Sequence, residues 1–391
     1  PEVGDPFIDV SESQASYGVV GHAPDEWMPE GLGLSVHYVD SSNFAAGAAG
    51  RNIFNEAAPF QTGVTEEYGF SVTALDQKLH LRVNKFDSSQ ANSKITGTIP
   101  NPFGIIGNVM NYNTPEALAA AGWNLDTIFK PGFLESANFR QEPDGMWMAD
   151  NIAGTSTNIY QDTVTEGTEI ELSYAPTKNW RWHFNAASAE VQVSNVMTDL
   201  AAENKRIVAE VFNDSKMGNL FTVSDPYLTD GSINPEAILS YRSSGLLSST
   251  AQKTSPEGGT LQELRKWRWN LLTNYTFDGD SGPEWLSGFG VGTGLRWQDK
   301  AIIGTALKQV EGVTVPDHDT QYFGSEELNV DAWVTYDTKV FDGHDLRLQA
   351  RIRNLTSDDD LIPVRANPDG SVALYRIGAP TWLELSARLK F

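Results

Sequence analysis

The sequence of 391 residues contains no cysteine, which excludes disulfide bonds, thiolate metal sites and cysteine nucleophiles. It also contains no run of 18 apolar residues, so a conventional transmembrane helix is excluded. Basic residues are scarce: 28 Lys and Arg stand against 51 Asp and Glu, and the formal net charge is -23. Because phosphate binding requires a basic surface, this balance argues against nucleic acid as a partner.

Recognisable catalytic motifs are absent as well. The sequence has no H-E-x-x-H, no G-x-S-x-G and no P-loop, and we therefore expect no enzymatic activity, no cofactor and no metal centre. His318 lies between Asp317 and Asp319, and the acidic run 358–360 could offer oxygen ligands to calcium. Neither segment has further ligands at a suitable spacing, so we interpret both as solvated surface loops.

The sequence is rich in strict alternation between apolar and polar residues. In 381–391, Leu383, Leu385, Ala387 and Leu389 alternate with polar side chains. A period of two is typical of a strand with two different faces. On this basis eleven strands are predicted, at 13–23, 31–42, 64–75, 77–88, 167–177, 180–192, 266–277, 288–297, 327–340, 345–355 and 381–391.

The segment GFGVGTGLRW, 288–297, places glycine at alternate positions. This spacing fails the G-x-G-x-x-G fingerprint of dinucleotide-binding loops. It predicts a strand whose glycine side is crowded or faces water.

Short and long connections alternate between these strands. The long ones are 43–63, 89–166, 193–263, 301–326 and 356–380. In an antiparallel meander, this alternation puts every short turn at one end of the sheet and every long loop at the other, as in outer-membrane barrels. Strands of about ten to fourteen residues exceed those of most soluble sheets but suit a tilted membrane crossing.

Tryptophan near the predicted strand ends fits the aromatic girdles of a membrane barrel. The residues are Trp27, Trp180, Trp182, Trp267, Trp269 and Trp285. The predicted fold is therefore all-β, an antiparallel up-and-down transmembrane β-barrel. A soluble β-sandwich is the alternative, because a sheet with one buried face also shows alternation.

The number of strands, eleven, is odd. A closed antiparallel barrel with both ends on one side of the membrane needs an even number. The strands 13–23 and 381–391 would run in the same direction, and an open sheet would expose its edges in lipid. We therefore expect residues 1–391 to form the carboxy-terminal part of one larger barrel domain.

Two helices are predicted within the long loops. One covers 113–122, with Thr114 as cap, Pro115 at the first position and Gly122 at the end. The other covers 199–212 and should pack on neighbouring loops through one stripe. The stripe consists of Leu200, Asn204, Ile207, Val208 and Val211.

The alternation also fixes which charges face the lumen. If the apolar face contacts lipid, Arg347, Arg351, Arg353 and Arg388 face inward, because an arginine facing lipid at the midplane costs about 2–4 kcal/mol. These side chains would contact water or a domain inside the lumen.

Ligand contacts are expected from the aromatic-rich loop 89–166. The candidates are Trp123, Phe139, Arg140 and Trp147. Packing of the aromatic side chains into a loop core is the competing interpretation.

Four segments resemble the carboxy-terminal half of TonB-dependent outer-membrane receptors: QTGVTEEYGFSVTALDQKLHLRVNKFDSS (61–89), EIELSYAPTKNWRWHFNAA (169–187), LRLQARIRNLTSDDD (346–360) and GAPTWLELSARLKF (378–391). The resemblance implies a 22-stranded barrel around an amino-terminal plug domain, with the plug and the first half of the barrel absent from this chain. It also implies that Phe391 is the terminal signal read by the barrel-assembly machinery. The other interpretation of Phe391 is an aromatic belt residue at the periplasmic interface of the membrane.

The resemblance further implies a place in the bacterial cell outer membrane, in contact with the lipid bilayer and lipopolysaccharide. The expected protein is a receptor for siderophore or nutrient uptake. It would bind a small-molecule or glycan ligand, such as an iron chelate, cobalamin or a glycan, and import it with a TonB-type inner-membrane partner. Two alternatives stay open: a passive porin-like channel, and a secreted β-sandwich that binds or hydrolyses glycans.

Overall fold

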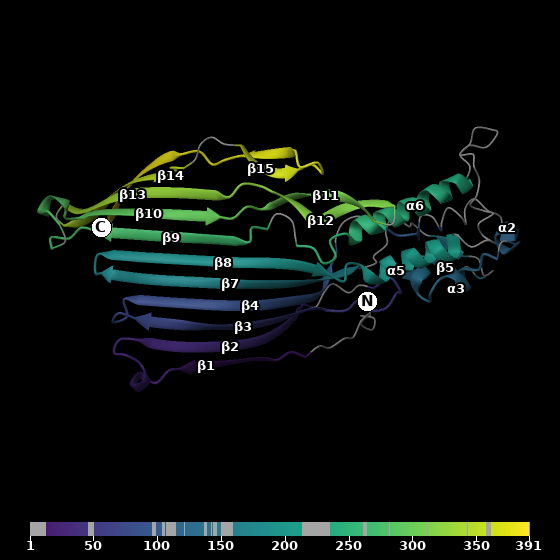
Figure 1. Ribbon diagram of the computed structural model, residues 1–391, viewed down its shortest axis with the longest axis horizontal. Coiled ribbons are helices and arrows are strands. Elements are labelled where there is room, and N and C mark those ends of the chain that lie inside the picture. Colours follow the sequence, from purple (N-terminus) through teal and green to yellow (C-terminus); the bar gives the residue numbers. More distant parts are fainter. Residues whose placement is uncertain are drawn as a thin grey trace, which may run out of the picture.

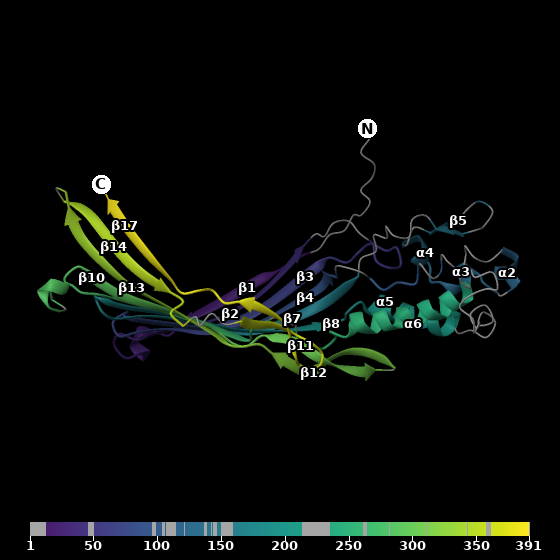
Figure 2. The same ribbon diagram turned by 90° about the horizontal axis from the view of Figure 1, so that it is seen from above.

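The structure is a computed structural model. It describes residues 13–45, 51–95, 99–103, 106, 115–120, 122–136, 139–141, 143, 147–149, 159–212, 235–260, 264–280, 282–310, 312–341, 343–356 and 361–390. One broad curved sheet occupies one end of the molecule, and helices with short hairpins occupy the other (Figure 1). Seen from above, the sheet forms a trough whose two edges rise on the same side (Figure 2).

The sheet contains eleven strands in chain order, and every neighbouring pair is antiparallel. The strands are β1 (Ser16–His22), β2 (Gly33–Ala45), β3 (Gln61–Ala74), β4 (Leu79–Lys94), β7 (Tyr160–Thr177), β8 (Trp180–Ser194), β9 (Trp267–Thr276), β10 (Phe289–Gln298), β13 (Glu327–Val340), β14 (His344–Arg353) and β17 (Trp382–Lys390). All eleven predicted strands are confirmed. The ends differ by a few residues, most at β7, which begins at Tyr160 where 167 was expected.

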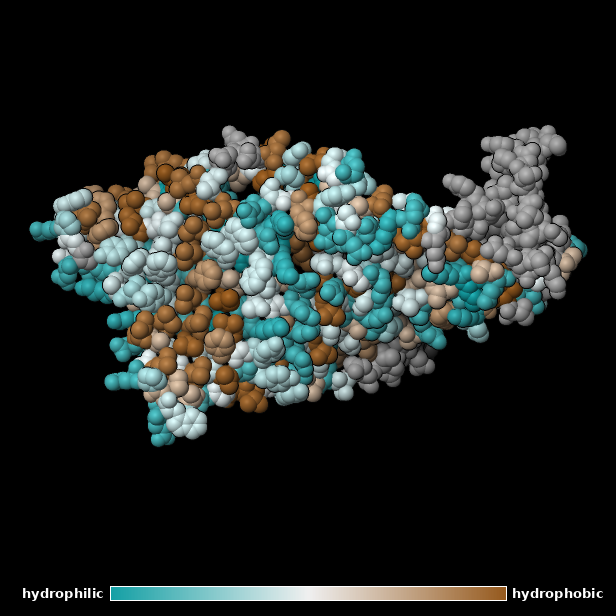
Figure 3. Space-filling model, viewed as in Figure 1, coloured by the Kyte–Doolittle hydropathy of each residue, from teal (hydrophilic) through white to brown (hydrophobic). Residues whose placement is uncertain are grey.

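The two faces of the sheet have different chemistry. The register pairs Leu348 with Ala387 and Ala350 with Leu385, so apolar residues lie beside apolar residues on the outer, convex face. Leu385 is 73% exposed there, and no second layer covers it within the described ranges. Figure 3 shows apolar side chains gathered over the part of the sheet nearest the short turns. This single-layer arrangement is that of a membrane barrel wall and differs from a β-sandwich, in which a second sheet would cover this face.

Aromatic rings mark two levels of the outer face. Near the short turns, Trp180 contacts Trp182 and Tyr275 with ring centroids 5.2 and 6.3 Å away. Nearer the long loops, Trp269 stacks on Trp297 at 6.2 Å. Two aromatic levels with aliphatic residues between them are typical of a barrel at its two membrane interfaces.

The short and long connections lie at opposite ends, as predicted. Two of the short turns form single 3-10 turns, η1 (Asp25–Trp27) and η5 (Glu284–Leu286). The long connections contain α2 (Pro115–Ala120), α3 (Leu125–Ile128), α4 (Phe133–Ser136), α5 (Thr198–Arg206), the π-helix η3 (Ile207–Phe212), α6 (Pro235–Thr254) and three hairpins, β5–β6 (Phe139–Gln141, Trp147–Ala149), β11–β12 (Ile302–Val310, Val313–Phe323) and β15–β16 (Leu361–Ala366, Val372–Ile377). None of the described helices is both long and apolar enough to cross a membrane.

Both predicted loop helices are present. The first is α2, and Gly122 follows it with φ +78°, a left-handed conformation that suits a helix end. Thr114 lies outside the described residues. The second consists of α5 and η3, so the helix widens to π geometry at Ile207. All five residues of its predicted stripe are buried.

Several sequence expectations for the loops need correction. The three hairpins and α3, α4 and α6 were not predicted. The segment around His318 is part of strand β12 and is not a solvated loop, because the register of β11–β12 pairs Ala306 with Asp317. Residues 358–360, considered for calcium, lie outside the described residues, and so does Phe391.

The long connections pack together into what we call the loop cap. Its core gathers buried apolar side chains from three long connections, 43–63, 89–166 and 193–263. They are Ile53, Phe103, Ile106, Trp123, Leu125, Phe129, Phe133, Leu134, Ile159, Val193, Val196, Met197, Leu200, Ile207, Val208, Val211 and Leu246. The molecule therefore buries its main hydrophobic core in the loops and not in the sheet.

Candidate functional site

The concave face of β13, β14 and β17 carries a ladder of paired charges. Arg347 donates to both carboxylate oxygens of Asp337, from Nε at 2.6 Å and from Nη2 at 2.8 Å. Further along β14, Arg353 Nη2 donates to Glu384 Oε2 at 3.1 Å. These pairs lie on the polar face of the strands, opposite the apolar face, as the alternation predicts.

Asp331 is the most buried charge of this ladder. Its carboxylate accepts hydrogen bonds from Arg351 Nη2 at 2.7 Å and from the backbone N–H of Asn354 at 3.1 Å. Arg296 Nη2 lies 3.5 Å away on the neighbouring strand β10. A buried carboxylate needs such partners, because an unpaired one is costly to desolvate. Asp331 thus joins β10, β13 and β14 into one rigid part of the inner wall.

The alternating glycines of β10 leave space for a tryptophan. The indole of Trp333 lies over Gly292, where an added Cβ would be 2.3 Å from the ring. The indole Nε1 donates to Asn274 Oδ1 at 3.2 Å, and the Arg351 guanidinium lies 5.7 Å from the ring centroid. The glycine side of this strand is therefore crowded, one of the two predicted possibilities.

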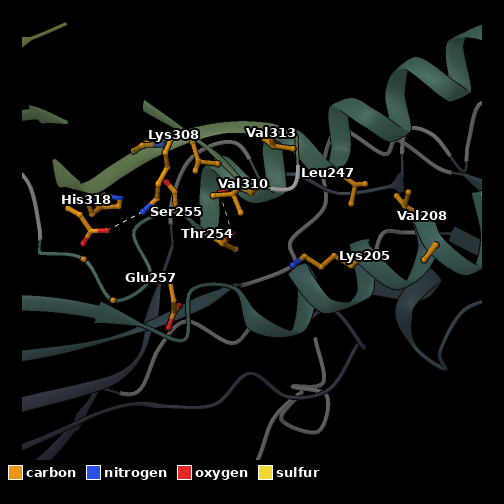
Figure 4. Close-up of a pocket in the computed structure, with 17 residues that line it drawn as sticks. Lys205, Val208, Leu247, Thr254, Ser255, Glu257, Lys308, Val310, Val313 and His318 are labelled. Carbon is orange, nitrogen blue, oxygen red and sulfur yellow. Dashed lines mark hydrogen bonds and ion pairs between the residues drawn. The ribbon is translucent and has the colours of Figure 1, made fainter. Parts of the chain in front are cut away.

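A cavity of about 670 Å³ opens between α6, the end of α5 with η3, and the β11–β12 hairpin. Figure 4 shows Leu247 on α6, Val208 on η3, and Val310 and Val313 on the hairpin around this space. Small-molecule sites in proteins commonly have such a volume and a mixed lining. No local pattern in the sequence indicates this cavity, because its walls come from two connections, 193–263 and 301–326.

The polar side chains of the cavity differ in the hydrogen bonds and ion pairs that they form. Lys308 Nζ lies 3.0 Å from Asp317 and 3.4 Å from Asp319, and these contacts raise the pKa of Lys308. The hydrogen bond from Lys308 lowers the pKa of Asp317. Glu257 accepts the backbone N–H groups of residues 195 and 196 at 3.0 and 2.8 Å.

His318 is the exception among these groups. Both of its ring nitrogens are buried, and neither has a hydrogen-bond partner among the described residues. The ring packs closely on Gly259, where an added Cβ would lie 3.1 Å from it. The cavity therefore combines an apolar lining with an imidazole that offers one donor and one acceptor.

The predicted ligand contacts are spread over the loop cap. Trp123 belongs to its core and is only 8% exposed. Phe139 and Arg140 lie on β5, and Trp147 lies on β6, where it pairs with Gln141. None of the four belongs to the described lining of the cavity, and their contact with a ligand stays a prediction. In the described ranges, no group of three or more metal-ligating side chains could hold a metal ion.

Comparison with known proteins finds similarity in structure but not in sequence. No protein-family model matches the chain, and no curated protein matches it. The FpvAI–pyocin S2 complex matches with a TM-score of 0.50 and 14% identity, over 98% of this chain and 34% of that one. The ferripyoverdine receptor of the outer membrane of Pseudomonas aeruginosa has a TM-score of 0.49 at 14% identity, over 97% of this chain and 33% of that one. The ferric-catecholate import receptor Fiu from E. coli K12 has a TM-score of 0.43 at 15% identity, over 97% and 35%.

These comparisons establish the fold. The chain has the antiparallel barrel-wall fold of TonB-dependent outer-membrane receptors, which confirms at the level of fold the resemblance seen in the sequence. The sheet itself is not closed. The chain spans about a third of the length of the structures it matches.

Proposed function

We propose that this chain is the carboxy-terminal part of the barrel of an outer-membrane receptor. The receptor binds a scarce nutrient, an iron chelate, cobalamin or a glycan, in its extracellular loops and imports it with TonB-type energy coupling. One observation carries the proposal: a single-layer sheet with an apolar outer face carries, at one end only, loops that pack into a core of their own.

The partners follow from this arrangement. The paired arginines of the inner wall contact a plug domain in the lumen, and a TonB-type protein moves that plug. The lipid bilayer and lipopolysaccharide cover the outer face. The assembly machinery reads the final residue, Phe391. The plug, the TonB-type partner and the assembly machinery are inferred from the resemblance to TonB-dependent receptors, and the contact with lipid is inferred from the apolar outer face.

Ligand capture is assigned to the loop cap. The cavity beside α6 supplies an apolar lining and His318. Arg140, on β5, stays a further candidate contact predicted from the sequence. Ligand pockets generally combine apolar walls with a few polar groups that fix orientation. No covalent chemistry is needed for this role.

Uptake by cells tests the function. Cells that express the full-length protein receive labelled iron chelates, cyanocobalamin and oligosaccharides in turn. At least one is expected to accumulate, and an uncoupler of the inner-membrane proton gradient or deletion of the TonB-type partner abolishes its accumulation. Accumulation that persists without the gradient identifies a passive channel and refutes the proposal.

A cavity-filling variant tests the assigned site. Ala251→Trp places an indole in the cavity, whereas Ser249→Trp alters an exposed position of α6 outside its lining. Ligand affinity should fall at least tenfold in Ala251→Trp and stay unchanged in Ser249→Trp, with both proteins present in the outer membrane at equal amounts. Equal affinity of the two variants would place the ligand elsewhere in the cap.

A further inference from the structure

The size of the cavity beside α6 limits what it can hold. Its volume is about 670 Å³. At about 30 Å³ for each non-hydrogen atom, the volume that a water molecule occupies, it has room for about twenty such atoms. Cobalamin has several times as many atoms and cannot enter as a whole. The cavity therefore receives either a small molecule or one arm of a larger one.

The walls of the cavity are mainly aliphatic. They are formed by Val208 on η3, Leu247 and Ala251 on α6, and Val310, Val313 and Val315 on the β11–β12 hairpin. None of the described lining residues is Phe, Tyr or Trp, so the lining offers no flat ring on which a sugar could stack. Val310 stays 43% exposed, and a ligand that covers it removes apolar surface from water. These walls suit an aliphatic chain and not a glycan.

Most charged groups around the cavity already have partners. Lys308 contacts Asp317 and Asp319. Both carboxylate oxygens of Glu257 accept backbone N–H groups, and Figure 4 shows this carboxylate pointing away from α6. The ring nitrogens of His318 are covered by protein atoms. A ligand would have to break existing contacts, or move the imidazole, to use any of these groups.

Lys205 differs from these groups. It lies on α5, and its exposed side chain reaches toward the space between α6 and the hairpin (Figure 4). Its neighbour Arg206 pairs with Glu203 and Glu210, whereas Lys205 forms no ion pair with any described residue. The helix continues as η3, so the ammonium has no free helix end to stabilise. Within the described lining, Lys205 thus offers an available cation beside an aliphatic space.

The backbone of α5 changes geometry next to this cation. The π-helix η3 begins at Ile207 and contributes Val208 and Ala209 to the wall of the cavity. Its other side is fixed in the core of the cap, where Ile207 is 0% and Val211 is 2% exposed. Short π-helical segments are rare and are found frequently at functional sites. The π-helix therefore marks the same wall as the lining and the cation, and it is an independent observation.

We propose that the cavity binds an aliphatic carboxylate, with the chain between α6, η3 and the β11–β12 hairpin and the carboxylate on the ammonium of Lys205. Hydrogen bonds between an ammonium and a carboxylate are among the strong ones, because both groups are charged. A free acid and the acidic arm of an iron chelate present this same chemistry, whereas cobalamin is too large and a glycan lacks the chain. The inference rests on the proposed function, in which the loop cap captures the ligand, and it narrows the ligand classes given there.

Binding of octanoate tests the contact directly. The full-length protein is placed in lipid nanodiscs, and fluorine NMR of a fluorine-labelled octanoate measures the bound fraction, with empty nanodiscs as the blank. Lys205→Met removes the charge but keeps the apolar stem, so the affinity for octanoate should fall by about tenfold or more, while that for octanol stays unchanged. Lys253→Met is the matched control, because Lys253 on α6 also lacks an ion pair with described residues but lies outside the lining. Octanoate that binds no better than to empty nanodiscs, or equally well to Lys205→Met, overturns the proposal.

Reversal of the charge tests the position of the carboxylate. Lys205→Glu should lose octanoate and prefer octylammonium, since the chain keeps its walls and only the charge beside them is exchanged. Ala251→Trp, which fills the space for the chain, should weaken binding of both probes. A Lys205→Glu protein that still prefers octanoate shows that the carboxylate lies elsewhere, and the proposal fails.

Uptake by cells identifies the source of the chain. Accumulation of labelled octanoate that depends on the proton gradient indicates a free acid. Inhibition by octanoate of the uptake of an iron chelate indicates the acidic arm of that chelate. Octanoate binding to the purified protein with neither effect in cells supports the ligand class of the cavity but contradicts the proposed function. Energy-dependent uptake of a nutrient without octanoate binding supports the function and overturns the inference.

Discussion

The sheet and the loop cap bury their apolar side chains in different ways. In the cap, Phe133 is 0% exposed and packs against the rings of Phe103 and Phe129 at 4.9 and 5.7 Å. In the sheet, Leu385 and its neighbours lie on an open face. The cap is held by burial of apolar groups away from water, whereas the sheet becomes stable when lipid covers its outer face. One chain thus combines the physics of a soluble domain with that of a membrane wall.

The largest expected effect separates these two regions. Phe133→Ala removes a fully buried ring from the core of the cap and should destabilise the cap by about 3–5 kcal/mol. Hydrogen exchange in α4 and α5 should rise, while the sheet keeps its resistance to unfolding in detergent. Leu385→Ala on the outer face should leave exchange in the cap unchanged. Loss of the sheet in Phe133→Ala would show that the two regions unfold as one.

A second prediction concerns the buried charge of the cap. Glu203 is 0% exposed and accepts hydrogen bonds from Arg206 at 2.5 and 3.1 Å, with Lys130 Nζ at 3.3 Å. The hydrogen bond from Arg206 to Glu203 raises the pKa of that guanidinium. Glu203→Gln should cost the cap about 2 kcal/mol, because the two cations lose their buried partner.

The control for this prediction lies one helical turn beyond Arg206. Glu210 also pairs with Arg206, at 3.2 Å, but its side chain is largely exposed. Glu210→Gln should change the stability of the cap by less than about 1 kcal/mol, because exposed ion pairs contribute little. Both variants are unfolded with denaturant, and cleavage of the loops by a protease reports the fraction of the cap that is unfolded. Equal losses would contradict the role given to Glu203.

The contrast between the two regions also explains what the sequence could predict. Alternation is a local property, so every strand of the sheet, the glycine face of β10 and the separation of arginines from the apolar face could be predicted from the sequence. The buried stripe of 199–212 was visible for the same reason, since helical periodicity is local too. The parity of the strands and their directions followed from counting alone.

The loop cap depends on contacts between distant segments. Asn204 donates hydrogen bonds to Thr250 Oγ1 at 3.0 Å and to the carbonyl of residue 100 at 2.9 Å. No local sequence pattern predicts these contacts. The cavity beside α6 likewise arises where the β11–β12 hairpin meets a helix from another connection. The polar segment around His318 was predicted to be a solvated loop. It lies instead in strand β12, because it pairs with β11. The candidate site is therefore formed by tertiary packing between distant segments, which sequence periodicity cannot predict.

The third prediction concerns crowding within the sheet. Gly292→Ala places a methyl group 2.3 Å from the indole of Trp333, which has to move. Overpacking of this kind should lower the stability of the barrel by about 1–3 kcal/mol. Gly294→Ala on the same strand meets its nearest atom at 3.7 Å and should be tolerated. Thermal unfolding in detergent compares the two, and equal stability of both variants would contradict the close packing of Trp333 on β10.

The smallest expected effect is a gain in stability. It concerns the level at which the outer face of the sheet leaves the membrane. Five carboxylates lie side by side across five strands on the outer face, one step beyond the level of Tyr38 and Tyr68 toward the loops. They are Asp40, Glu66, Asp87, Glu166 and Glu190, each directly opposite the next. Like charges opposite each other are destabilising, so this row lies in water and not in lipid.

Asp87 lies between two other carboxylates of this row, and Asp87→Asn should therefore stabilise the barrel by about 0.2–1 kcal/mol at low ionic strength. The gain should shrink as salt screens the repulsion. Glu190→Gln should have no such benefit, because Glu190 already pairs with Lys266 at 2.8 Å. Unfolding temperatures at low and high salt distinguish these effects. If Asp87→Asn destabilised the barrel at both, the row would be engaged by a partner, and the upper part of the sheet would not be a freely solvated wall.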